Sequence, residues 1–238
     1  MVADAKVLDK RRSEIQSMFS ALAPRYDLLN RLLSARRDVA WRRAAAAALD
    51  VQPGSLVLDV CCGTGDQALA VHHRQARVVA ADFSLSMLRL ARQKFDQVAG
   101  ARPLGLAGDT LQLPAADRRF AALTVSFGLR NVEDLLAALR EMYRVLRPGG
   151  TTAILEFATP EGTLFRQIYL FYFLHLLPRI GRLLSPRGSA YRYLTDSVIS
   201  FPQRRGFIDQ MTEAGFINTA WQDLSGGIVC LYTGTRSK

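Results

Sequence analysis

The sequence predicts an α/β fold built on a doubly wound, mostly parallel, seven-stranded sheet that ends in a C-terminal antiparallel hairpin. Three observations support this prediction. Short apolar runs recur without strict alternation, as expected of strands that are buried on both faces. Helical segments separate these runs, which is typical of parallel sheets. Near the C-terminus, the sequence DLSGG joins two apolar runs so tightly that their strands must be antiparallel.

The elements follow one another in a regular order. Two N-terminal helices are expected at 10–23 and 25–49, before the turn signal Pro53-Gly54. Strands then alternate with helices. The strands are expected at 55–60, 77–81, 103–107, 120–126 and 151–157, and the helices between them at 66–73, 84–97 and 133–145. An aromatic and aliphatic helical region at 162–184 follows, and a helix near 203–214 leads to a strand at 216–221 and the final strand in IVCLYTG.

Composition narrows the class of protein. The 238 residues are 49% hydrophobic, enough for the core of one domain. The net charge of +10 favours an anionic partner, either nucleic acid or an acidic membrane surface. The basic residues form scattered pairs, each of which alone indicates a solvated surface. The three cysteines suggest neither disulfides nor a metal site, and the absence of an apolar segment near the N-terminus predicts a cytoplasmic protein without a secretory signal.

The stretch LVLDVCCGTGDQALA, residues 56–70, runs from a strand into a glycine-rich loop. Its G-x-G-x-x-A spacing also fits a dinucleotide site, so a nicotinamide oxidoreductase is an alternative. Charge separates the two interpretations: carboxylates would repel a pyrophosphate, whereas they attract the sulfonium and ammonium of S-adenosylmethionine. The expected cofactor-binding residues of this loop are Asp59, Gly63, Thr64, Gly65 and Asp66.

Further cofactor contacts are expected where the next strands end. Asp82 ends the second strand, where an acid accepts hydrogen bonds from the ribose hydroxyls. Asp109, with Thr110 beside it, follows the third strand and is expected to accept from the adenine amino group. Met87 is expected against the adenine ring, although a core position suits it equally. Ser126 ends the fourth strand, near the sulfonium.

Motifs that the sequence lacks narrow the possible classes of methyl acceptor. The segment SFGLRNVED stands where methyltransferases of base amino groups commonly carry an Asn/Asp-Pro-Pro-aromatic turn. Cys61, Cys62 and Cys230 are unsuitably placed for a nucleophile, and packing explains the first two better. The apolar run 168–178 is well short of the ~20 residues needed to cross a bilayer. It is either a core helix or a pocket wall at an anionic membrane surface, which the flanking arginines favour: Arg166, Arg179, Arg182 and Arg187.

From Tyr26 to Gly234 the chain resembles the bacterial quinone C-methyltransferases, which methylate demethylmenaquinol or the related ubiquinone precursor. The resemblance rests on YDLLNRLLS, VLDVCCGTGD, DFSLSML, FGLRNV, MYRVLRPGG, LEFATP, FRQIYLFYFLHLLP, YRYLTDSV, EAGF and LSGGIVCLYTG. FGLRNV, YRYLTDSV and the GG hairpin are the more particular motifs, and FRQIYLFYF is closer to the menaquinone branch. The resemblance implies S-adenosylmethionine as methyl donor, no metal, and C-methylation of an isoprenoid quinol in menaquinone biosynthesis.

This reaction needs a phenolate next to the carbon that is methylated. We expect Arg130 to stabilise the oxyanion and Asn131 to hold the hydroxyl, with an ion pair as the structural alternative for Arg130. Water or His175 would take the proton, because arginine stays charged. The expected acceptor pocket also includes tyrosines for which a core position is equally consistent: Tyr26, Tyr169, Tyr191 and Tyr193.

The predicted organisation is one domain with four parts. They are an N-terminal helical cap (1–50), a cofactor-binding core (51–160), a helical acceptor-site insertion (161–200), and a closing helix and hairpin (201–238). The sequence does not decide whether the cap moves as a lid. The protein is expected at the inner face of the membrane, and the sequence does not decide between a monomer and a homodimer. Methylation of the ubiquinone precursor, an RNA methyltransferase and a non-catalytic lipid carrier remain alternative functions; no nucleic acid is expected as partner.

Overall fold

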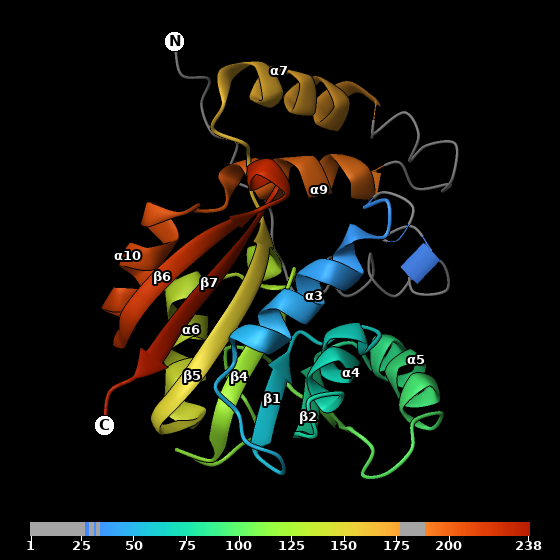
Figure 1. Ribbon diagram of the computed structural model, residues 1–238, viewed down its shortest axis with the longest axis vertical. Helices are drawn as coiled ribbons and strands as arrows, with labels where there is room; N and C mark the ends of the chain where they lie inside the picture. The colour runs from blue at the N-terminus through green and yellow to red at the C-terminus, as the bar shows by residue number, and fades with distance from the viewer. Residues whose placement is uncertain (1–26, 29–30, 32–33, 177–188) are drawn as a thin grey trace.

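The computed structural model describes residues 27–28, 31, 34–176 and 189–238. Its centre is one seven-stranded sheet with the order β3-β2-β1-β4-β5-β7-β6 (Figure 1). Five strands are parallel, and β7 and β6 complete the sheet as antiparallel neighbours. The predicted fold class is therefore confirmed. The strands are β1 (Leu56–Val60), β2 (Arg77–Asp82), β3 (Leu104–Ala107), β4 (Phe120–Ser126), β5 (Leu146–Phe157), β6 (Phe216–Leu224) and β7 (Val229–Arg236).

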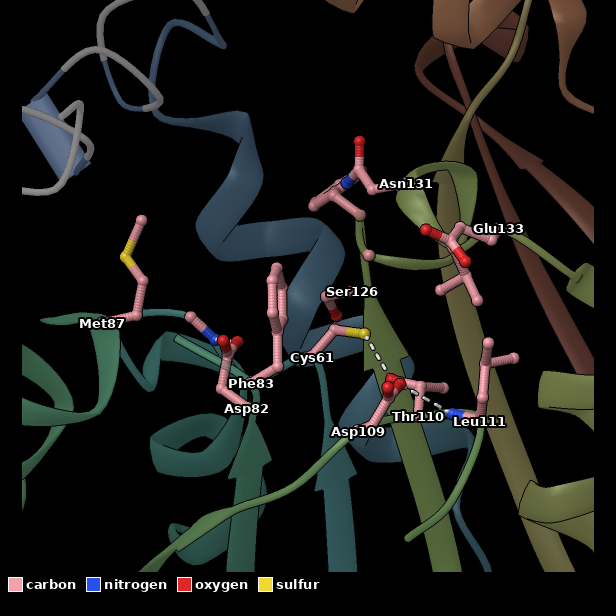
Figure 2. Close-up of a pocket in the computed structure, with 14 residues that line it drawn as sticks. Cys61, Asp82, Phe83, Met87, Asp109, Thr110, Leu111, Ser126, Asn131 and Glu133 are labelled. Carbon is pink, nitrogen blue, oxygen red and sulfur yellow. Dashed lines mark hydrogen bonds between the residues drawn. The ribbon is translucent and has the colours of Figure 1, made fainter. Parts of the chain in front are cut away.

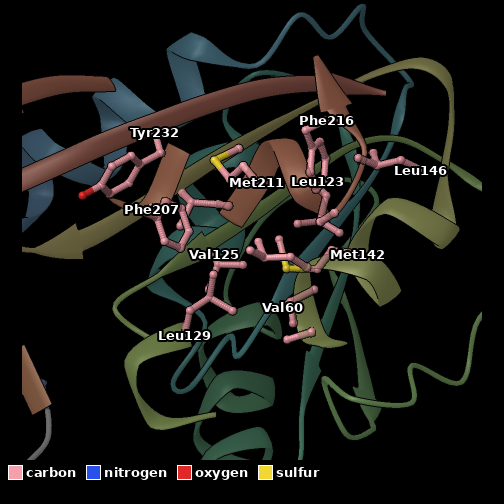
Figure 3. Close-up of a cluster of buried hydrophobic side chains, with 14 of the residues drawn as sticks. Val60, Leu123, Val125, Leu129, Met142, Leu146, Phe207, Met211, Phe216 and Tyr232 are labelled. Carbon is pink, nitrogen blue, oxygen red and sulfur yellow. The ribbon is translucent and has the colours of Figure 1, made fainter. Parts of the chain in front are cut away.

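Helices cover both faces of the sheet because neighbouring strand residues point to opposite sides. Leu58 packs into a core under α6 and α10, shown in Figure 3, whereas Val57 packs under α3, α4 and α5. Both residues are fully buried. These helices are α3 (Arg37–Ala48), α4 (Asp66–His72), α5 (Leu85–Phe95), α6 (Leu135–Val145) and α10 (Arg205–Glu213). Two apolar layers therefore hold the strands in register.

Two helical predictions differ from the structure. The segment 25–49 is not one helix, because a turn with positive φ at Ala35 and Arg36 precedes α3. The region 162–184 contains α7 (Thr163–Phe171) and a π-helical turn η3 (Tyr172–Leu176), and its remainder lies outside the described residues. The predicted helix at 10–23 also lies outside them. The helix α9 (Ser189–Ser200) lies within the predicted helical insertion 161–200, for which no separate helix was predicted after residue 184.

The ligand-binding edge is the one where the parallel strands end. The helices α7 and α9 lie beyond this edge, near the ends of β4 and β5 (Figure 1). A short 3₁₀ turn, η2 (Leu129–Asn131), follows β4 and contacts α9. The segments after Phe157 therefore lie beyond the edge at which the parallel strands end.

Candidate active site

The loop after β1 depends on glycine at two positions, for two different reasons. Gly63 has a φ of +55° and open space where a Cβ would stand. Gly65 has a φ of +85°, and a Cβ there would lie 2.6 Å from the Phe95 ring of α5. Only glycine adopts such backbone conformations without strain. Gly63 thus keeps the loop open towards a ligand, while Gly65 allows α5 to pack against it.

A cavity of about 770 Å³, open mouth included, lies at this edge of the sheet (Figure 2). Side chains from the loops after β1, β2, β3 and β4 all face it. The lining residues are Cys61, Gly63, Asp82, Phe83, Met87, Asp109, Thr110, Leu111, Ser126, Phe127, Gly128, Asn131, Val132 and Glu133.

Six of the ten residues predicted to bind the cofactor line this cavity. The loops that carry them are separated by tens of residues, yet all follow parallel strands and therefore meet at one edge. The remaining four do not line the cavity: Asp59 lies in β1, and Thr64, Gly65 and Asp66 lie in the loop and helix start that follow it. The six are Gly63, Asp82, Met87, Asp109, Thr110 and Ser126.

Asp82 is the most firmly held carboxylate of the cavity. Its Oδ2 accepts a hydrogen bond from the Gly63 amide and its Oδ1 accepts one from the Ser84 amide, both at 2.8 Å. Burial raises the pKa of Asp82, while these two amides lower it. Each carboxylate oxygen keeps a second lone pair. The arrangement therefore leaves acceptor capacity for two ligand hydroxyls.

The opposite wall is built from the loop after β3. Asp109 Oδ1 accepts from the Leu111 amide at 3.0 Å, which fixes the turn. The hydroxyl of Thr110 lies 3.2 Å from the Cys61 sulfur (Figure 2). Met87, at the start of α5, is 2% exposed and faces the cavity from the other side. An acid, a hydroxyl and an apolar side chain thus surround the space between the two loops.

Two of the predicted carboxylates do not line the cavity. Asp66 pairs with Lys94 at 2.5 Å, and the same Lys94 lies 2.6 Å from Asp27 and 3.1 Å from the Thr64 hydroxyl. Asp59 is fully buried, and burial raises its pKa to about 8 against the lowering effect of Arg42. Lys94 therefore compensates the charge of Asp66, and burial disfavours the charged form of Asp59; a contact of either acid with the cofactor stays a prediction.

Two polar atoms on the cavity wall have no hydrogen-bond partner in the described part of the chain: Ser126 Oγ and Asn131 Oδ1. Both atoms are buried, and both residues line the cavity just after β4. Buried polar groups are normally hydrogen-bonded. These two positions therefore suit a ligand, next to the carboxylates that suit the nucleoside.

Arg130 lies behind the cavity wall rather than on it. It is 5% exposed, and its Nη1 lies 3.1 Å from Oε2 of Glu156 and donates to the Phe127 carbonyl. The Arg130 amide donates to the other oxygen of Glu156 at 3.3 Å. Burial raises the pKa of Glu156, while Arg130 lowers it. The geometry favours the ion-pair alternative, and Glu156 is a site residue that sequence reasoning missed.

The predicted acceptor residues are only partly described. Tyr26 and the side chains of His175 and Tyr191 lie outside the described residues. Tyr169 is buried and stacks on Phe173, with 5.2 Å between ring centres. Tyr193 is half-buried, and its hydroxyl has no partner among the described side chains and backbone groups. Burial raises the pKa of Tyr193 to about 12, and the charge of Arg130 lowers it, which places this hydroxyl near the buried pair.

Among the described residues, no group of three or more His, Cys, Asp or Glu side chains is placed so that it could hold a metal ion. The three cysteines are free thiols. Cys61 and Cys62 pack in the loop, and burial raises the pKa of both thiols. This agrees with a packing role rather than a nucleophilic one.

Comparisons with known proteins agree with this geometry. The chain is 43% identical over 229 residues to a demethylmenaquinone methyltransferase of Mycolicibacterium paratuberculosis, covering 96% of each chain. It is 44% identical over 233 residues to the ubiquinone/menaquinone biosynthesis C-methyltransferase UbiE of Geotalea daltonii, covering 96% of this chain and 99% of that one.

The fold also matches solved methyltransferases. The structure of magnesium protoporphyrin IX methyltransferase from Synechocystis with bound S-adenosylmethionine has a TM-score of 0.63 at 16% identity, covering 97% of this chain and 98% of that one. The model of the ubiE/COQ5 methyltransferase family matches residues 5–236. The chain therefore belongs to the ubiE/COQ5 methyltransferase family.

Proposed function

We propose that this methyltransferase transfers the methyl group of S-adenosylmethionine to a ring carbon of demethylmenaquinol, giving menaquinol. One observation carries the proposal: a single cavity joins the carboxylates Asp82 and Asp109 to the unpartnered polar atoms of Ser126 and Asn131. The first pair suits a nucleoside, and the second suits a hydroxylated ring beside it. The names of the relatives support the quinol as acceptor.

The residues present fit the cofactor. Asp82 would accept from the ribose hydroxyls with its remaining lone pairs, and Asp109 would accept from the adenine amino group. Gly63 leaves the backbone open towards the ligand. The cofactor, when bound, supplies an electrophilic methyl group on a sulfonium, which the nearby carboxylates favour.

The acceptor residues act by holding an oxygen atom. Asn131 has a free Oδ1 for a ring hydroxyl, and its amide group also offers donors to the phenolate. Arg130 is better described as a positioning residue, because its ion pair with Glu156 ties the turn after β4 to β5. Arg130 directly precedes Asn131 in the chain, so its positive charge stays near this residue. Asn131 is therefore proposed to contact the substrate oxygen, and Arg130 is proposed to hold the turn that carries Asn131.

The experiment that tests this function uses labelled S-adenosylmethionine with reduced demethylmenaquinone. The expected product is labelled menaquinol. The parallel reactions contain the demethylated ubiquinone precursor or bulk RNA as acceptor. Label in RNA alone would overturn the proposal, and quinone binding without any transfer would indicate a lipid carrier instead.

We also propose that menaquinone is the main product. The relatives carry both menaquinone and ubiquinone/menaquinone names, so the choice rests on the segment FRQIYLFYF. A competition between the two quinols at equal concentration measures the preference. The expected result is at least a severalfold excess of menaquinol, and equal use of both would replace this choice with a dual function.

We also propose that the protein contacts the anionic inner face of the cytoplasmic membrane peripherally. In the part of the chain that the structure describes, no helix is long and apolar enough to cross a membrane. The α7–η3 segment, however, exposes a row of apolar side chains at helical spacing, each between 40% and 71% exposed. They are Leu164, Phe165, Ile168, Phe171 and Leu174.

Vesicle flotation tests this contact. The chain should float with phosphatidylglycerol vesicles and less with phosphatidylcholine vesicles, because its net charge is +10. Ile168→Ser should weaken flotation, whereas Ile217→Ser, at an exposed apolar position on β6, should not. Equal flotation of both variants contradicts the membrane role, and a change of oligomeric state with Ile168→Ser assigns the row of apolar side chains to a homodimer interface.

A further inference from the structure

The helices beyond the sheet have a small core of their own. Tyr169 in α7, Phe173 in η3 and Val198 in α9 form a buried cluster that belongs to neither apolar layer of the sheet. Of the described side chains packed around this cluster, two also border a sheet layer, Phe157 and Ile228. The position of α7 and α9 relative to the cavity therefore depends on how the chain leaves the sheet and returns to it.

Both ends of this helical segment meet at one side chain, Gln203. Its Oε1 accepts hydrogen bonds from the amide and the hydroxyl of Thr159, at 2.9 and 2.7 Å. Its Nε2 donates to the carbonyl of Val198, in the last turn of α9, at 2.8 Å. Thr159 precedes α7 and is 44 residues from Gln203 in the chain. These three hydrogen bonds, which we call the Gln203 junction, use the acceptor of one amide group for the entry to the segment and a donor for its exit.

Arg204 fixes the Gln203 junction to the sheet. Arg204 is 8% exposed, and its Nη1 donates to the Thr159 carbonyl at 3.0 Å. Its Nε donates to Asp223 Oδ1 of β6 at 3.1 Å, and its amide donates to the Tyr232 hydroxyl of β7 at 2.8 Å. The φ of Arg204 is +49°, a strained value that persists where surrounding contacts hold the residue in place. The C-terminal hairpin therefore anchors the base of the helical segment.

We propose that Gln203 is a positioning residue for the methyl acceptor, because it holds α9 against η2, the turn that carries Asn131. This inference rests on the proposed function, in which Asn131 contacts the quinol. Without the Gln203 junction, only a fraction of the molecules keeps the arrangement that binds the acceptor, and the apparent affinity falls by that fraction. Bound acceptor restores the arrangement, so the rate at saturation stays the same.

The test is Gln203→Ala, which removes the junction and leaves no buried charge behind. A change at Arg204 is less suitable, because it would leave Asp223 without its partner. The KM for reduced demethylmenaquinone should rise roughly 5- to 20-fold, the loss expected for one or two hydrogen bonds. The kcat and the affinity for S-adenosylhomocysteine, measured by calorimetry, should stay unchanged. An unchanged KM, or an equal loss in all three quantities, would overturn the proposal.

Two sets of variants serve as controls. Thr159→Ser keeps the hydroxyl and should match the wild type, whereas Thr159→Val loses it and should raise KM. Adding Thr159→Val to Gln203→Ala should raise KM no further, because the two side chains share one hydrogen bond; additive effects would contradict the junction. Gln210→Ala makes the same substitution at a half-buried position on α10, which packs against α6 and β6, and should keep the wild-type KM.

Hydrogen exchange separates this inference from the proposed function, since it needs no acceptor. In Gln203→Ala, amide exchange should become faster in α7 and α9 and stay unchanged in β1 and β4. Faster exchange with an unchanged KM would show a structural contact without a role for the acceptor, and would overturn the assignment. If the wild type transfers no methyl group to the quinol, the proposed acceptor falls, while faster exchange confined to α7 and α9 still supports the Gln203 junction.

Discussion

The two halves of the cavity hold their polar groups in different ways. On the cofactor side, comprising residues 61–66, Asp82 and Asp109, backbone amides fix the cavity-lining carboxylates. On the acceptor side, comprising residues 126–131, Glu156 and Tyr193, one side chain holds another through the Arg130–Glu156 pair, and several polar atoms have no partner among the described residues. Groups held by a local loop depend on its backbone conformation, whereas groups held by a side-chain pair depend on both partners.

The largest effect is expected from breaking the buried pair. Glu156→Gln leaves the Arg130 charge buried without full compensation, which should lower the free energy of unfolding by about 3–5 kcal/mol. Urea denaturation measures this loss. The double variant Arg130→Met with Glu156→Gln should regain part of it, because no uncompensated charge remains. A loss below about 1 kcal/mol in the single variant would show that the pair does not hold the acceptor side.

The next effect separates the two sides by function. Asn131→Ala removes the group that would hold the quinol oxygen, so turnover should fall by roughly 100-fold, the usual loss for one such hydrogen-bonding group. Binding of S-adenosylhomocysteine should stay unchanged, because the nucleoside contacts lie on the cofactor side. A methyl-transfer assay measures the turnover of the variant, and calorimetry measures its binding of S-adenosylhomocysteine. A comparable loss in both assays would mean that the two sides are not separable.

The two loop glycines offer a matched pair on the cofactor side. Gly65→Ala combines a φ of +85° with a Cβ placed 2.6 Å from Phe95, so it should destabilise the fold by about 1–3 kcal/mol. Gly63→Ala has a positive φ but open space, so its cost should stay near the lower end, at ~1 kcal/mol. Thermal or urea unfolding ranks the two variants. The reverse order would contradict the role of α5 packing.

The smallest effect concerns Asp59 and pH. Since burial raises the folded-state pKa to about 8 from 3.8, the folded protein binds a proton between these values that the unfolded chain releases. Stability therefore falls as pH rises through this range, by at most ~1.4 kcal/mol per pH unit. Asp59→Asn should remove this contribution and gain on the order of 1 kcal/mol at pH 8 relative to pH 7. An unchanged pH profile in urea unfolding would contradict the buried, protonated carboxyl.

The cofactor side is also the part that sequence reasoning reaches best. Asp82 and Asp109 each end or follow a short apolar strand, and parallel topology brings such residues to one edge of the sheet. The antiparallel hairpin was equally readable, because DLSGG leaves no room for a crossover.

Several features that were not predicted from the sequence depend on contacts between residues far apart in the chain. Glu156 is 26 residues from Arg130, and Lys94 is 28 residues from Asp66, so no local pattern marks either pair. The break before α3 was missed because Ala35 and Arg36 adopt positive φ without a glycine to signal it. The bounds of α9 were not predicted within the helical insertion 161–200, because its sequence follows a long apolar run that dominates the pattern.

The cavity is expected to select an S-adenosyl nucleoside over a dinucleotide with its pyrophosphate. Calorimetric titration of the wild-type chain with S-adenosylhomocysteine and, separately, with a nicotinamide dinucleotide tests it most directly. The expected result is saturable, one-to-one binding of S-adenosylhomocysteine and no measurable heat from the dinucleotide. Tight binding of the dinucleotide, with none of S-adenosylhomocysteine, would contradict it.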